Sequence, residues 1–78
     1  MTDKQLRLAG SIKSGVLADL DTVVRVMTSG ADRNNPTHLA AIEKIERAAV
    51  TLRNEERAQF WLDHRYDNAQ SLIRQIAK

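Results

Sequence analysis

The stretch SGADRNNPT, residues 29–37, separates two helix-forming parts of the sequence. Gly30 can adopt the left-handed backbone conformation that commonly ends a helix. Asn35 and Pro36 are typical of the N-cap and the first turn of the helix that follows. The stretch therefore predicts a helix, a short loop and a second helix, which together form a helical hairpin.

The first helix is predicted over about residues 3–29. Thr2 and Gln5 have the T-x-x-Q spacing of a capping box, in which each side chain binds the backbone N–H group of the other residue. Apolar residues then recur at steps of three and four, as on one face of an amphipathic helix. These are Ala9, Ile12, Val16, Leu20, Val23, Val24 and Met27.

The segment after the loop contains no further proline or glycine and is helix-competent from 36 to 77. Counting 100° per residue gives two apolar stripes, turned about 100° from each other, that change over near residues 53–59. They are Ile42, Ile45, Ala49, Leu52 and Phe60, and then Leu62, Tyr66, Ala69, Ile73 and Ile76. Either two helices, about 36–53 and 55–77 with Asn54 as N-cap, or one long bent helix gives this pattern. No strand alternation occurs. The predicted fold is all-α, a single domain over 1–78, as a helical hairpin or a three-helix arrangement.

The second stripe raises the question of what covers it. An antiparallel hairpin would leave residues 62–76 exposed, so either this segment folds back or a second copy of the chain packs on it. The first helix also carries a ridge of small residues opposite its apolar stripe, and these are Ser11, Gly15, Ala18 and Thr22. This ridge could be a plain solvent-facing side of the helix. Gly10 and Gly15 each cost about 1 kcal/mol inside a helix, which favours close approach of another helix. A helical-bundle homodimer is therefore predicted.

The composition is that of a small ordered domain. The chain has 78 residues, of which 42% are hydrophobic and 28% charged, and it has no cysteine, which excludes disulfides and thiolate metal sites. The net charge is only +2, so a basic binding surface requires that like charges be gathered on one face. No apolar run approaches the roughly 20 residues that cross a bilayer. We expect a cytoplasmic protein without a membrane partner.

No set of residues in the sequence indicates catalysis. His64 lies beside Asp63 and three residues before Asp67, but a metal site needs three or four convergent ligands. His38 lies in the first turn of the second predicted helix. Neither a nucleophile elbow nor a phosphate-binding glycine loop occurs. We therefore expect no enzymatic activity, no metal or other cofactor and no small-molecule substrate.

One polar face of the predicted helix is organised. From Arg47 onward, a face about 80° wide carries no acid. It holds Arg47, Val50, Asn54, Arg57, Trp61, Arg65, Asn68 and Leu72. Arg57 lies four residues before Trp61 and Arg65 four after it, so either guanidinium could stack on the indole ring. Tryptophan and arginine are also the residues most enriched at binding hot spots.

Two interpretations of this face remain open. Trp61 could pack beneath the first helix or a second copy, with the arginines extending around it. The functional interpretation is a partner-binding face made of Arg47, Asn54, Arg57, Trp61, Arg65 and Asn68. An acidic protein surface is the first expected partner, which would make the chain an adaptor, regulator or inhibitor of another protein. A nucleic acid bound by a dimer is the alternative.

Overall fold

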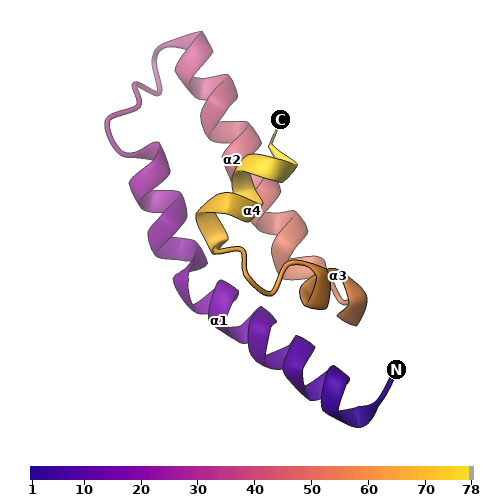
Figure 1. The fold of residues 1–78 in the computed structure, drawn as a ribbon. Helices are drawn as coiled ribbons and strands as arrows, with labels where there is room; N and C mark the ends of the chain where they lie inside the picture. The colour runs from indigo at the N-terminus through magenta and orange to yellow at the C-terminus, as the bar shows by residue number, and fades with distance from the viewer. Residues whose placement is uncertain (78) are drawn as a thin grey trace.

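The computed structural model describes residues 1–77, and these form four helices (Figure 1). They are α1 (Asp3–Thr28), α2 (Pro36–Asn54), α3 (Ala58–Asp63) and α4 (Ala69–Ile76). The described residues contain no strand, so the predicted all-α class is confirmed. The molecule is elongated, 48 × 18 × 17 Å, because α1 and α2 form a long hairpin that the two short helices cover only in part.

The hairpin forms where the sequence predicted it. The Thr2 hydroxyl accepts a hydrogen bond from the Gln5 N–H group at 3.2 Å, and the Gln5 side chain accepts one from the Thr2 N–H group at 3.0 Å, which completes the capping box. After α1, Gly30 has a φ angle of +79°, in the left-handed region. The Asn35 side chain then caps α2 by accepting hydrogen bonds from the N–H groups of Thr37 and His38.

The second half of the chain differs from the prediction. α2 ends at Asn54, close to the predicted boundary, but the predicted helix over 55–77 is divided into α3 and α4. Asn54 is not an N-cap, since Arg57 holds that position for α3. Asn68 caps α4 instead, accepting a hydrogen bond from the Ser71 N–H group at 2.8 Å. The turn before it is closed by His64 and Asp67, whose Nδ1 and Oδ2 atoms lie 2.7 Å apart.

These turns allow the C-terminal segment to fold back onto the hairpin. α1 packs against α2, α3 and α4, and α4 also packs against α2. The centre of the core is formed by the largest fully buried side chains, which are Leu20, Leu52, Trp61, Leu72 and Ile73. Burial of each such side chain contributes about 1.5–3 kcal/mol to the free energy of unfolding. Because Leu72 and Ile73 belong to α4, this short helix supplies a large share of the core. By folding back, the chain itself thus buries Leu62, Ala69 and Ile73 of the second stripe, for which a second copy was the alternative, and the homodimer stays a prediction.

Two findings concern the surface of the helices. No helix among residues 1–77 is both long enough and apolar enough to cross a membrane. A Cβ atom placed on Gly10 or Gly15 would meet no atom within 4 Å, so nothing within the chain requires glycine at these two helical positions. At Gly30 the positive φ angle, and not crowding, is what favours glycine.

We expect opposite effects from alanine at two of the glycines. Gly10→Ala should raise the free energy of unfolding by about 0.5–1 kcal/mol, because it removes backbone freedom from a helical position with open space. Gly30→Ala should lower it by about 1 kcal/mol, since a Cβ atom is disfavoured at positive φ. Urea unfolding followed by far-UV circular dichroism measures both changes. Destabilisation by Gly10→Ala would contradict the open helical environment described for this position.

Candidate partner-binding surface

Trp61 lies in the core, as in the first of the two interpretations left open by the sequence, and does not face outward with the arginines as the partner-binding interpretation predicted. Its side chain is 1% exposed, its ring packs edge-on against Phe60 with centroids 5.0 Å apart, and its Nε1–H group donates a hydrogen bond to the Glu55 carbonyl oxygen at 3.0 Å. The prediction counted 100° per residue across residues 55–57 and 64–68. These residues are not helical, so the count loses its meaning there.

Arg57 is exposed but already engaged by an acid. Its Nε and Nη2 atoms each donate to one carboxylate oxygen of Glu55 at 2.9 Å, and its backbone N–H group donates to the same carboxylate at 3.0 Å. These hydrogen bonds lower the pKa of Glu55 to about 2 and raise the pKa of Arg57. Counting 100° per residue had placed Glu55 on the side of the predicted helix opposite to the arginine face. The pair forms because a turn brings residues two apart together, which a helix does not do.

Arg65 and Asn68 lie in the turn between α3 and α4. The Arg65 guanidinium carbon lies 5.0 Å from the ring centroid of Tyr66. Arg65 therefore stacks on Tyr66 and not, as predicted, on Trp61. Tyr66, predicted to be part of an apolar stripe, is 90% exposed because the turn removes it from any helix. Asn68 uses its side chain oxygen to cap α4.

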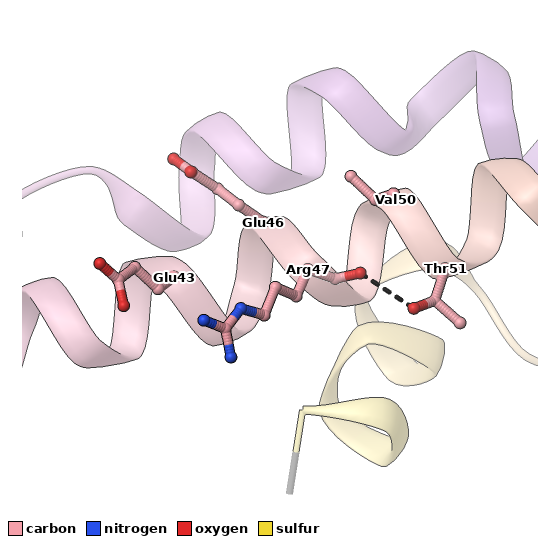
Figure 2. Close-up of a pocket in the computed structure, with 5 residues that line it drawn as sticks. All are labelled: Glu43, Glu46, Arg47, Val50 and Thr51. Carbon is pink, nitrogen blue, oxygen red and sulfur yellow. Dashed lines mark hydrogen bonds between the residues drawn. The ribbon is translucent and has the colours of Figure 1, made fainter.

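Arg47 and Asn54 are exposed on α2, Arg47 in its middle and Asn54 at its last residue. Figure 2 shows Arg47 directed to the side of α2 on which α4 lies, whereas Glu46 and Val50 point to the other side. All five residues that line the hollow of Figure 2 belong to α2, and they are Glu43, Glu46, Arg47, Val50 and Thr51. The predicted six residues therefore do not form one face, and Arg47 and Arg65 stand at opposite ends of α4.

A second surface does gather around Arg47, between α2, α4 and the end of α1. Two hollows adjoin there and share Lys44 and Ala77. The first is lined by Met27, Ala41, Lys44, Ile45, Ile73, Arg74 and Ala77. The second is lined by Lys44, Arg47, Ala48, Thr51, Ile76 and Ala77. We call the two hollows together the α2–α4 groove.

The charged side chains among the described residues that line the α2–α4 groove are all cations. Lys44, Arg47 and Arg74 are exposed at its edge, and the acids nearest to Arg47 along α2, Glu43 and Glu46, line the separate hollow of Figure 2. Within residues 1–77 these three cations form no ion pair, whereas Arg33, Arg53 and Arg57 pair with Glu46, Asp21 and Glu55. The floor between the cations is made of aliphatic side chains. An unneutralised basic edge around an apolar floor suits a ligand that carries both carboxylates and apolar groups.

Sequence reasoning missed two of the three cations. Lys44 lies one helical turn before Arg47, so its proximity could have been found from spacing alone. Arg74 comes from α4, and it joins the others only because the chain folds back. No spacing in the sequence indicates that contact.

We expect the acid stability of the protein to depend on Glu55. Because its pKa in the folded chain, about 2, lies below the ordinary 4.5, the stability that it contributes is present above pH 4.5 and is lost as the pH falls toward 2. Glu55→Gln should therefore make the free energy of unfolding less dependent on pH over this range. Urea unfolding, followed by the fluorescence of the buried Trp61 at several pH values, measures the difference.

Glu56→Gln is the matched control for this measurement. Glu56 is exposed and makes no side-chain hydrogen bond or ion pair within residues 1–77, so its replacement should leave the wild-type pH dependence unchanged. Equal slopes for Glu55→Gln and the wild type would show that the turn at Glu55 and Arg57 does not contribute to acid stability.

Comparison with known proteins finds no family model that matches this chain, no curated protein of similar sequence and no solved structure of similar fold. Function must therefore be inferred from the groove itself, from its charges and from what its lining residues can contact.

Proposed function

We propose that the protein is a non-enzymatic interaction module that binds an acidic surface of another protein in the α2–α4 groove, as an adaptor, regulator or inhibitor. The observation that carries this proposal is a set of three cations that have no acid partner within residues 1–77 and that surround an apolar floor. Lys44, Arg47 and Arg74 would each gain a carboxylate partner on binding, and the aliphatic floor would exchange water for apolar contacts.

The floor favours a protein over a nucleic acid. Phosphate groups are bound by exposed cations and gain nothing from aliphatic side chains such as Ile45, Ile73 and Ile76. The arginine stripe that supported the nucleic-acid alternative is also interrupted, because Arg57 is neutralised by Glu55. The total charge of +2 adds no general attraction to a polyanion.

The side chains of the groove suit binding better than catalysis. Among the described residues that line the groove, Thr51 carries the only hydroxyl, and this hydroxyl donates to the Arg47 carbonyl oxygen at 3.0 Å. The same described residues include no histidine, Asp or Glu that could remove a proton from it. Cations around an apolar floor instead match the composition of recognition surfaces.

We expect the protein to bind poly-L-glutamate at low salt in isothermal titration calorimetry. Lys44→Glu and Arg47→Glu should each weaken this binding by about tenfold, because they place an acid opposite the ligand. Arg65→Glu is the matched control, since Arg65 is equally exposed but lies outside the groove, and it should change the affinity little. Equal loss in all three variants would show that charge alone, and not the groove, is responsible.

Mixed-sequence duplex DNA, titrated beside poly-L-glutamate at low salt and again at a higher salt concentration, separates the protein partner from the nucleic-acid alternative. Binding to DNA that is tighter than to poly-L-glutamate and falls steeply with salt would contradict an acidic protein partner. Failure of the protein to bind poly-L-glutamate at all would overturn the proposed function.

We further propose the homodimer expected from the sequence as the assembly state, with the ridge of small residues on α1 facing the second copy. The support is that Ser11, Gly15, Ala18 and Thr22 are exposed in the single chain. Sedimentation equilibrium should then show a mass that rises with concentration, and Gly15→Ala should weaken association by holding the helices apart. Gly10→Ala, turned about 140° from Gly15, is its control. A monomer mass at every concentration would defeat this assembly.

A further inference from the structure

α4 packs on α1 and α2 as a third helical layer. This layer ends before the α1–α2 hairpin does. α4 lies across the middle of the α1–α2 hairpin, and the hairpin continues beyond it toward the loop that joins α1 to α2 (Figure 1). Because seven residues are two helical turns, residues seven apart share a face. Ala48 on α2 is 2% exposed, whereas Ala41 on the same face is exposed. On α1, Leu20 is 0% exposed and Met27 only partly buried.

The core faces of both hairpin helices therefore continue past the last turn of α4 without a covering element among residues 1–77. Ala41, which is exposed, and Met27 and Ile45, which are partly buried against the core, form this incompletely covered continuation. They line the first hollow of the α2–α4 groove with Ile73 and Ala77 at the end of α4. The hollow is a vacant position in the third helical layer and not a depression on a single helix.

The charges around this vacant position indicate the chemistry of what covers it. Lys44 projects from α2 and Arg74 from α4, so the hollow has a cation on each of two of its helices. None of the lining residues within 1–77 is acidic. A covering segment must therefore present apolar side chains toward Met27 and Ile45 and carboxylates toward both cations, with the two kinds of side chain on adjacent strips of its surface.

We infer that the occupant is an amphipathic α-helix of a partner protein, with an apolar stripe flanked by Asp or Glu, which continues the layer that α4 begins. This inference rests on the proposed function and assigns its ligand. Every wall of the hollow is a helix, so the side-chain ridges of another helix fit between those of α1 and α2. An exposed strand edge, which an extended peptide would need, does not occur in residues 1–77.

The test uses two synthetic peptides of the same composition, each of about four helical turns. In the patterned peptide, leucines recur at i, i+3, i+4 and i+7 with glutamates beside them; in the scrambled peptide, the same residues follow no helical period. Each peptide is titrated into the ¹⁵N-labelled full chain. The patterned peptide should bind at least about tenfold more tightly than the scrambled one and shift the amide signals of Met27, Ala41 and Ile45.

Ala41→Glu should weaken binding of the patterned peptide by about tenfold or more, because it introduces a carboxylate on the apolar floor. Since Ala41 is exposed, this variant should keep the wild-type circular dichroism spectrum. Ala40→Glu is the matched control: it makes the same substitution at the neighbouring exposed alanine of α2, which does not line the groove, and it should leave binding unchanged.

The outcomes separate this inference from the proposed function. Equal affinity for the two peptides, with loss of both in Lys44→Glu, would leave an acidic partner but overturn the amphipathic helix. Peptide-induced shifts confined to residues outside the groove would also overturn the inference. So would shifts at Ala41 that appear when the protein alone is concentrated, because they would identify a second copy of the chain as the occupant. Failure to bind either peptide and poly-L-glutamate would overturn both proposals.

Discussion

The hydrogen bond from the Trp61 indole to the Glu55 carbonyl oxygen is the interaction on which the rest of the structure depends. A tryptophan can be fully buried only if its N–H group finds an acceptor, and helical carbonyl groups are already occupied by the helix itself. Because α2 ends at Asn54, the carbonyl of Glu55 is free to accept at 3.0 Å. The end of α2 therefore makes the burial of Trp61 possible. α3, which carries Trp61, follows this break in the helix.

The fold-back of α4 follows from the same geometry. With Trp61 directed inward, α3 lies against α1, and the turn at His64 and Asp67 sends the chain back along the hairpin. Leu72 and Ile73 then complete the core, and Arg74 arrives beside Lys44. The position of Arg74 in the groove thus depends on a partly buried hydrogen bond that no lining residue of the groove makes.

Sequence reasoning succeeded where the signal was local. The capping box at Thr2, the left-handed Gly30 and the cap at Asn35 each depend on residues within a few positions, and all three are present. It failed for Trp61, because a helical wheel keeps its phase only within an unbroken helix. Of the candidate site, Arg47 could be predicted, and Lys44 was within reach of the same spacing argument. Arg74 could not, since only tertiary contact places α4 beside α2.

The first two turns of α1 show what the absence of such contacts means for motion. Residues 1–8 are all exposed, and Ala9 is the first side chain that the core covers. Within the described part of the chain, the hydrogen bonds that hold this end are those of the capping box and of the helix itself, so opening it costs a small part of the free energy that unfolding the core requires. Amide hydrogens in these turns will exchange with solvent by local fraying, while those around Leu20 and Leu52 exchange only when the whole domain opens. The protein thus has a rigid body and a softer end within a single helix.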